Sequence, residues 1–553
     1  MPFVRSKVLA LACALAAAGA LAGAQAASET ETGQFPTELV VAFNELDFEL
    51  DPHRSIYSAE AQIFTAIYEG LFNYDPYSLD PVKAACRSYT RSQDGKTYTF
   101  TIREDAEWSD GTPLLARDFR DSWLRVLAPD SEADYAAFFD IIRGARDYRT
   151  EKSKNSSSVG IEAVSDKVLK VTLTSRSDYF TRLLCHHSFS PVHPSMVERA
   201  DWTEAARGSP ESFPVNGPYR LTEVSADGMK LSANPRYWDA ESVLVSDLRF
   251  IFTDDDADVT RRFDDGGIHW LAGPMDIDTL LDRDSIQVNP MFGTHYWFFD
   301  CASTPWSDPL LRRALALLLP WEEIRSEKQY ATPAQTLVLP YSGYQEAKGI
   351  SAADEQEAAR LLEASGHGGG AGILPALVIL VPDTEDAKRV SKLMEEAWNT
   401  LPELRVERKI VPASRYFELV RAGPSASGYT IAMTTWIGDF ADPLAFLQMW
   451  TSDSNLNDAG LADKEYDKLL SDAAAKEGTD RLSALAVAET KLLSEAAVLP
   501  IYHSLAANAI DTEYVRGWYQ NFLDIHPFKY LEFGERRIRP NVAQATKGRS
   551  AGS

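Results

Sequence analysis

Hydrophobic residues in the first half of the chain follow the spacing of short strands more often than that of helices. Strand-like patterns cover 37–43, 98–102, 168–173 and 248–252, whereas 59–71 has apolar residues at helical spacing. Asp-Gly stands shortly before the second of these strands, and this dipeptide is typical of a hairpin turn. These patterns predict short strands in the first half, with a hairpin turn before residue 98.

The second half changes to longer helices that alternate with strands. Helical spacing covers the ranges 309–318, 355–364, 386–401, 465–475 and 480–493. Apolar strands are expected at 374–381 and 406–411. Strand–helix–strand alternation favours α/β units around a partly parallel sheet, so we expect a mixed α/β (α+β) protein.

The two ends of the chain differ from the rest. Two positive charges, an apolar run over 8–24 and small residues up to Ala26 are typical of a secretory signal peptide covering 1–26. A lipid anchor at Cys13 is disfavoured because it follows the charged start too closely. No other segment approaches the ~20 apolar residues of a membrane span. We therefore expect a periplasmic protein, with a disordered tail over 535–553.

Composition narrows the classes of partner and chemistry. A chain of 553 residues is too long for one small core and implies several domains. Its net charge of −26 disfavours nucleic acid and anionic membranes as partners. After signal cleavage Cys86, Cys185 and Cys301 remain, which permit at most one disulfide and show no zinc-ligand spacing.

Motifs of catalysis are missing from the sequence. It contains no Gly-x-Ser-x-Gly elbow, His-Glu-x-x-His helix or Walker loop. The glycine-rich run 366–372 follows a helix and precedes a strand, which is the wrong order for a phosphate loop. Cys185, His186, His187 and His193 could form a metal cluster, but adjacent histidines of an extended segment point to opposite faces. We expect no enzymatic activity, no cofactor and no metal.

Four groups of motifs resemble the peptide-binding branch of the extracellular solute-binding proteins, family 5, in order and spacing from about residue 38 to 533. They are Tyr68-Glu69-Gly70-Leu71-Phe72 with Trp108-Ser109-Asp110-Gly111-Thr112-Pro113; Asn216-Gly217-Pro218-Tyr219 with Asn234-Pro235-Arg236-Tyr237-Trp238-Asp239; Gly293-Thr294-His295-Tyr296 with Leu311-Arg312-Arg313-Ala314-Leu315; and Trp436-Ile437-Gly438-Asp439-Phe440-Ala441-Asp442-Pro443.

The resemblance implies a fold of the class II periplasmic binding proteins (type C), with three lobes arranged as a two-part clamp. Lobe I would comprise 36–57, 175–288 and 506–534. Lobe II would be 58–174, and lobe III 289–505.

The resemblance also implies a binding cleft. Asp439 corresponds to the carboxylate that captures the α-ammonium group of a peptide. Trp436 corresponds to an aromatic wall of a side-chain pocket, Gly438 to a point of close approach by the peptide backbone, and Tyr135 to a tyrosine that closes over the ligand. The remaining cleft positions of the family correspond to Tyr296, Arg421 and Asp47.

Three positions depart from the family pattern. Phe298 stands in place of an acidic pocket residue, Ser414 in place of a tryptophan, and Met433 in place of an arginine available to a peptide carboxylate. The amine anchor is kept while several pocket contacts are lost, so peptide length and sequence preference stay open.

The function implied by the resemblance is capture of short peptides by hinge closure, and their delivery by a monomer to the permease subunits of an ABC importer. The same fold could instead bind a nickel complex, haem, a sugar or a cell-wall peptide. A secreted hydrolase would need a nucleophile–base pair that the sequence does not display. Adhesion or sensing would be an added role.

Overall fold

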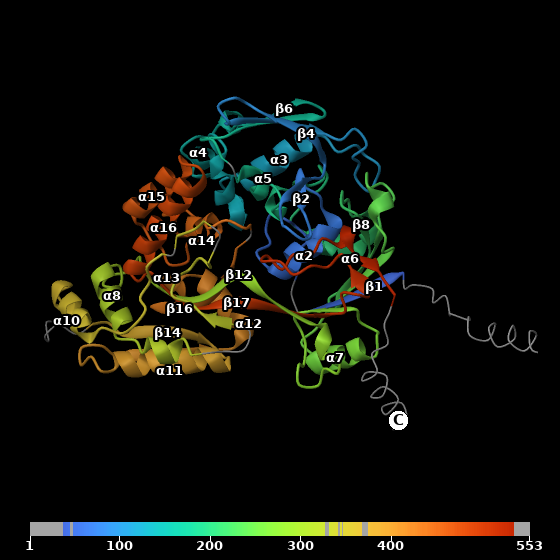
Figure 1. Cartoon of the computed structure of the whole chain (residues 1–553). Helices are drawn as coiled ribbons and strands as arrows, with labels where there is room; N and C mark the ends of the chain where they lie inside the picture. Colours follow the sequence, from blue (N-terminus) through green and yellow to red (C-terminus); the bar gives the residue numbers. More distant parts are fainter. Residues whose placement is uncertain are drawn as a thin grey trace, which may run out of the picture.

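A computed structural model of the chain describes residues 37–44, 48–177, 179–326, 331–340, 343–345, 347–367, 374–438 and 440–535. The expected signal peptide, and the expected tail beyond residue 535, lie outside these ranges. Figure 1 shows one long sheet along the lower half of the molecule and a smaller sheet above it. No helix among the described residues is long and apolar enough to cross a membrane.

The long sheet has 11 strands in the order β15-β14-β16-β12-β17-β11-β1-β10-β9-β8, with β13 paired to β17. Their bounds are β1 (Glu38–Phe43), β8 (Tyr219–Val224), β9 (Gly228–Ala233), β10 (Asp247–Phe252), β11 (Trp270–Ala272), β12 (Ile286–Phe299), β13 (Ala331–Pro333), β14 (Leu377–Pro382), β15 (Val406–Val411), β16 (Ile431–Ile437) and β17 (Val498–Ile510).

Two long antiparallel strands at the centre, β12 and β17, connect the two ends of this sheet. Their register runs from Ile286 opposite Ala509 to Phe298 opposite Val498, with an interruption between Pro290 and Thr294. β17 pairs with β11 at one end, and β12 pairs with β16 at the other. The interruption therefore lies where the strands pass from one end of the sheet to the other.

A second unit, which we call the cap (residues 72–172), covers the long sheet from above in Figure 1. Its sheet has the order β4-β5-β7-β6 and is entirely antiparallel. Its elements are β2 (Phe72–Tyr74), β3 (Pro81–Lys83), β4 (Cys86–Arg91), β5 (Thr97–Ile102), α3 (Ala116–Val126), the 3₁₀ helix η1 (Asp134–Ile141), α4 (Ala145–Arg149), the 3₁₀ helix η2 (Ser156–Ser158), β6 (Ile161–Ser165) and β7 (Val168–Thr172).

Helices pack around both sheets. At the β1–β8 end of the long sheet and in the segment after the cap these are α2 (Ser58–Ile67), α5 (Phe180–Leu183), α6 (Trp202–Gly208) and α7 (Asp256–Asp264). At the other end they are α8 (Pro309–Leu317), α9 (Trp321–Ile324), α10 (Glu355–Ala364), α11 (Glu385–Trp398), α12 (Ala413–Arg421), α13 (Pro424–Ser427), α14 (Leu444–Leu447), α15 (Lys464–Ala474) and α16 (Gly478–Ser494). Short 3₁₀ helices and a small sheet of β18 (Val515–Arg516) with β19 (Glu532–Phe533) complete the described chain.

Most predicted elements are confirmed within a few residues. The alternation of β5 buries every second side chain, and Asp94-Gly95 forms the turn between β4 and β5, with Gly95 at a φ of 71°. The predicted alternation of strand and helix is confirmed as β14–α11–β15, whose two strands pair in parallel. The fold is therefore the expected mixed α/β type.

Two predicted elements have the wrong bounds, for identifiable reasons. The helix expected over 59–71 ends at Ile67, because the Asn216 side chain binds the Glu69 backbone: Glu69 N–H donates to Asn216 Oδ1 (3.1 Å), and Asn216 Nδ2 donates to the Glu69 carbonyl (2.7 Å). The strand expected from 374 begins only at Leu377, after Pro375, which has no N–H group for a strand ladder.

Candidate functional site

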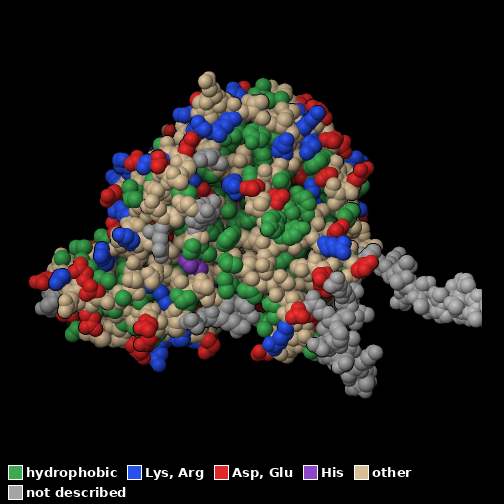
Figure 2. Space-filling view, in the orientation of Figure 1, with side chains coloured by type: hydrophobic (Ala, Val, Ile, Leu, Met, Phe, Trp, Pro, Cys, Tyr) green, Lys and Arg blue, Asp and Glu red, His purple; other side chains and the backbone are tan. Residues whose placement is uncertain are grey.

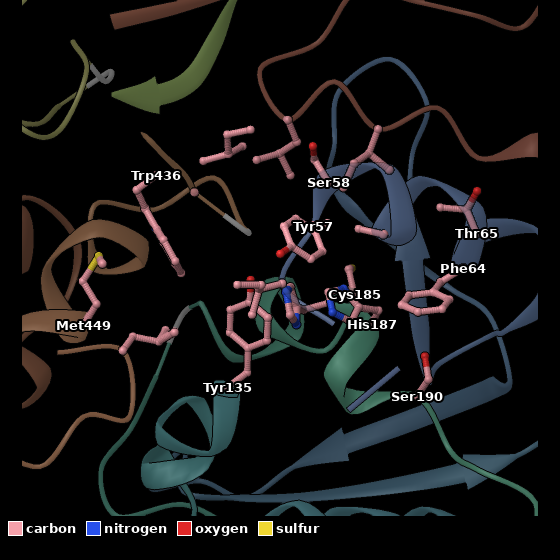
Figure 3. A pocket seen from close by; sticks show the side chains of 18 of the residues that line it. Tyr57, Ser58, Phe64, Thr65, Tyr135, Cys185, His187, Ser190, Trp436 and Met449 are labelled. Carbon is pink, nitrogen blue, oxygen red and sulfur yellow. The ribbon is translucent and has the colours of Figure 1, made fainter. Parts of the chain in front are cut away.

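A cavity of about 310 Å³ lies between the cap and the long sheet. It is lined from α2 and the segments on either side of it, from Tyr135 on η1, from the segment 185–190, and from β12, β16, α12 and the 449–458 segment. Figure 2 shows hydrophobic side chains gathered along the middle of the face shared by these parts. Figure 3 shows Tyr135 and Tyr57 between Trp436 and Met449 on one side and Phe64 and Ser190 on the other.

Trp436 forms one fixed wall of the cavity. It lies on β16 opposite Thr294 of β12, and its indole Nε1 donates to the Ala445 carbonyl (2.9 Å). This hydrogen bond holds the ring plane, so the aromatic face is available without reorganisation. The Tyr135 ring lies 6.4 Å from the Trp436 ring, centroid to centroid, and thus brings the cap against β16.

Gly438, directly after β16, is needed for packing. A Cβ atom at this position would lie 2.5 Å from Cδ1 of Phe292 and 2.9 Å from Cε2 of Phe446. Its N–H donates to the Phe292 carbonyl (2.6 Å). The glycine therefore lets the chain turn along the cavity between two aromatic rings.

Along the cavity, one edge of β16 has no partner strand among the described residues. The backbone N–H of Met433 donates to the Tyr416 hydroxyl (2.8 Å), and this hydroxyl donates to the Met433 carbonyl (2.9 Å). Both backbone groups of Met433 therefore point away from β12. Backbone groups alternate along a strand, so those of Thr435 and Ile437 point the same way. Both residues line the cavity, and among the described residues β14 pairs with this edge only at Ile431. An extended ligand could pair with this edge.

Arg421 connects α12 to the cap. Its guanidinium forms an ion pair with Asp134, the first residue of η1. Asp458, which also lines the cavity, lies close enough for Arg421 to lower its pKa, but burial is the larger effect and raises the pKa to about 6. This end of the cavity is therefore charged, whereas most of the lining is apolar or aromatic.

Glu69 contributes a second buried carboxyl group to the wall. Trp238 Nε1 donates to its Oε1 (2.6 Å), and the Tyr237 hydroxyl donates to Oε2. Burial raises the pKa of Glu69 to about 7, against the opposing effect of nearby Lys529. Tyr237 and Trp238, which belong to the second group of motifs, thus hold this carboxyl group in place.

Cys185, His186 and His187 line the cavity together. The expectation that the two adjacent histidines point to opposite faces was wrong. The two histidine rings lie on the same side, with centroids 4.1 Å apart, because a 3₁₀ turn (η3, His187–Phe189) replaces the expected extended segment. Burial lowers the pKa of His186 to about 3. Among the described residues, no group of three or more His, Cys, Asp or Glu side chains is arranged so that it could hold a metal ion. Cys86, Cys185 and Cys301 are free thiols.

The structure brings five of the residues indicated by the resemblance to this one cavity: Tyr135, Tyr296, Arg421, Trp436 and Gly438. Asp439 and Asp47 lie outside the described residues. Sequence reasoning did not identify Asp458, Asp134 or Glu69. Asp458 stands in Asn457-Asp458-Ala459-Gly460, which has the composition of an ordinary turn.

The three departures from the family pattern occupy different environments. Phe298 is buried, with its ring edge-on to that of Trp450. Met433 is half-buried and packs against the hydrophobic core. Ser414 is exposed on α12 and does not line the cavity.

Comparisons with known proteins agree with the geometry. The family model described as bacterial extracellular solute-binding proteins, family 5, middle region, matches residues 80–458. The dipeptide-binding protein DppE of Bacillus subtilis is 27% identical over 496 residues, which cover 87% of this chain and 88% of the relative.

Two solved structures share the fold. The murein tripeptide-binding protein MppA of Escherichia coli superposes with a TM-score of 0.77 at 23% identity, covering 90% of this chain and 99% of the other. The OppA protein of Haemophilus influenzae, in complex with the peptide RPPGFSPFR, superposes with a TM-score of 0.76 at 24% identity, covering 91% and 100%. The expected periplasmic-binding-protein fold is therefore confirmed.

Proposed function

Because the chain belongs to the bacterial extracellular solute-binding proteins, family 5, we propose that it captures short peptides in the cavity and delivers them to the permease of an ABC importer. The observation that carries this proposal is the unpaired edge of β16 along the cavity wall. A peptide backbone offers alternating donors and acceptors that can add to such an edge, while side chains enter pockets on either side.

The relatives support a peptide as cargo. The named relatives bind dipeptides and murein tripeptides, and one solved structure holds a nonapeptide. The apolar and aromatic lining of the cavity suits varied side chains, and Trp436 supplies a fixed aromatic surface.

Capture would proceed by closure of the cap over the cavity. Contacts between Tyr135 and Trp436 and between Asp134 and Arg421 join the cap to the far side of the cavity. The strands β12 and β17, with their interruption between Pro290 and Thr294, would serve as the hinge. The closed form would dock on the permease, and export by the signal peptide would place the protein in the periplasm.

The anchor for the peptide amine is Asp439, assigned by the resemblance alone. A charge-assisted hydrogen bond in a closed cleft contributes about 1.5–3 kcal/mol, which is tenfold or more in affinity. We expect Asp439→Ala to weaken binding of trialanine at least tenfold, measured by calorimetry on protein freed of co-purified ligand. Asp472→Ala, at an exposed position on α15, is the control. Unchanged affinity in Asp439→Ala would remove this residue from the site.

The other functions that the sequence left open are separated by two measurements. Mass spectrometry of ligand released from natively purified protein would identify a metal complex, haem, sugar or peptide directly, and finding only a non-peptide cargo would contradict the proposal. Incubation with trialanine followed by chromatography would reveal hydrolysis, and a solute-binding protein is expected to return the peptide intact.

A further inference from the structure

Asp458 is a carboxylate of the cavity wall that the proposed peptide anchor does not use. It lies in the segment after η7 (Gln448–Trp450), and no described residue donates a hydrogen bond to its side chain. A partly buried carboxylate with free lone pairs favours a donor that carries positive charge.

Tyr296 supplies a second polar atom at the same place. Its side chain is only 1% exposed, and its hydroxyl has no hydrogen-bond partner among the described residues. Asp458 and Tyr296 line the same cavity, and after burial the charge of Asp458 is the effect that raises the pKa of this phenol. A buried hydroxyl without a hydrogen-bond partner is unfavourable, so it is suited to a ligand that supplies a partner.

The segment that carries Asp458 is firmly held. The Asn457 side chain donates to the carbonyls of Thr451 (3.1 Å) and Leu461 (2.8 Å) and accepts from the Leu461 N–H (3.0 Å). On the other side of Asp458, the buried Ala459 accepts a hydrogen bond from the Cys301 N–H (2.8 Å). The carboxylate is therefore presented by a preorganised turn, and binding would not need to order it.

The surrounding charges leave a net negative potential. Asp458 faces Arg421 and Asp134, which are paired with each other. Arg54 also acts on Asp134 but is itself paired with Glu132. Three carboxylates and two guanidinium groups leave one negative charge, which a cation from the ligand would balance.

We propose that Asp458 and the Tyr296 hydroxyl form a subsite for a basic side chain of the ligand, so that peptides containing lysine or arginine are preferred. The side-chain ammonium would donate to the Asp458 carboxylate and to the Tyr296 oxygen. This inference rests on the proposed function and adds to it a preference in side-chain chemistry, separate from the capture of the α-ammonium group.

The test compares tripeptides that differ in one charge. Trialanine derivatives carry lysine at the first, second or third position, and each is matched with norleucine, which has the same carbon chain without the ammonium group. Calorimetry at pH 7.5 on ligand-free wild-type protein is expected to show at least tenfold tighter binding of lysine than of norleucine at one position. Asp458→Asn should abolish this preference, so that the lysine and norleucine peptides bind with equal affinity. Asp472→Asn should keep it.

Each outcome decides the question. If peptides bind but lysine and norleucine are equal at every position, the subsite is wrong and the proposed function stands; this comparison needs no variant. If the preference persists in Asp458→Asn, the subsite is also wrong. If no tripeptide of either series binds, the proposed function fails, and the inference with it. Tyr296→Phe is expected to reduce the preference, because only one acceptor for the ammonium remains.

Acidification gives an independent readout. Because the pKa of Asp458 is about 6, with Arg421 and Asp134 as the charged groups facing it, the lysine preference is expected to decline between pH 7 and pH 5. Binding of the norleucine peptide should change less over this range. A lysine preference that is equal at pH 7 and pH 5 would contradict the subsite.

Discussion

At the residue scale, the loop after β16 is held by a buried ion pair between Arg481 and Asp442. The two hydrogen bonds measure 2.7 and 2.8 Å, and both side chains are less than a tenth exposed. Asp442 also accepts a hydrogen bond from the N–H of Leu444 at the start of α14 (2.9 Å), and the Arg481 guanidinium lies over the Tyr179 ring. This pair thus fixes the turn that leads into α14.

Removing one member of a buried pair leaves an uncompensated charge, which costs about 3–5 kcal/mol. We therefore expect Arg481→Met to lower the free energy of unfolding by about 3 kcal/mol, measured by urea unfolding. Arg360→Met is a matched control, because its ion pair with Glu357 is exposed, and it should change stability by less than about 0.5 kcal/mol. Equal stability of the two variants would show that the buried pair is not needed.

Single residues could be assigned to the site from the sequence only where they belong to a recognisable motif. Trp436 and Gly438 stand in a distinctive motif, and the structure places them at the cavity. Asp458 could not be recognised, because its role depends on the distant residues Tyr296 and Arg421 being brought beside it. The packing reason for Gly438, the rings of Phe292 and Phe446, was equally invisible in the local sequence.

At the element scale, amphipathic elements were predictable and the central strands were not. α10 and β15 have the predicted bounds because one face of each is polar. β17 is buried on both faces, so its apolar run has no period that separates a strand from a helix. β12 has 14 residues and contains Pro290 and Gly293 near its interruption. These two residues are unusual inside a strand, so the sequence pattern did not predict one here.

Helix α4 of the cap is joined to the 451–458 segment by charged hydrogen bonds. Arg146 donates to both carboxylate oxygens of Asp453 (2.6 and 2.8 Å), and Arg149 donates to the Asp453 carbonyl (2.9 Å). In the same segment, Asn455 Nδ2 donates to the Ala133 carbonyl of the cap (3.2 Å). If the cap opens to admit a ligand, as proposed above, these contacts have to break.

If closure accompanies binding, weakening these contacts should weaken binding without a change in the cavity itself. We expect Asp453→Ala to raise the dissociation constant for trialanine about fivefold, mainly through faster release, since a partly exposed ion pair contributes up to about 1 kcal/mol. Stopped-flow displacement and calorimetry would measure both. Glu162→Ala removes an exposed ion pair within the cap and should have no effect. An unchanged release rate in Asp453→Ala would contradict a closing role for this contact.

At the scale of the whole molecule, buried histidines and buried carboxyl groups oppose each other in the response to acid. Burial lowers the pKa of His53 and His503 to about 4 and that of His186 to about 3. Burial raises the pKa of Glu69 and of Glu489 to about 7, as it raises that of Asp458 to about 6. The histidines stabilise the fold only while they are neutral, whereas the carboxyl groups are more easily accommodated when protonated.

The signs follow from comparison with the unfolded chain. Below pH 6.5 the unfolded histidines take up protons that the folded ones do not, so acidification destabilises the fold. Between about pH 7 and 4.5 the folded carboxyl groups hold protons that the unfolded ones do not, so acidification stabilises it. The two effects on the free energy of unfolding offset each other down to about pH 4.5. Below this pH only the destabilising effect of the histidines continues, and it ends once the histidines are protonated in the folded protein as well.

We therefore expect the free energy of unfolding to be nearly constant from pH 6.5 to 4.5 and then to fall, by up to about 4 kcal/mol per pH unit for three histidines. Urea unfolding followed by tryptophan fluorescence at half-unit intervals of pH would measure this profile. Glu489→Gln removes one compensating group, while its side-chain oxygen can still accept from the N–H groups of Leu337 and Val338. That variant should begin to lose stability already below pH 6.5. A wild-type profile that falls steadily from pH 6.5 would show that the buried carboxyl groups are ionised in the fold, and the charge balance around Asp458 would then have to be reconsidered as well.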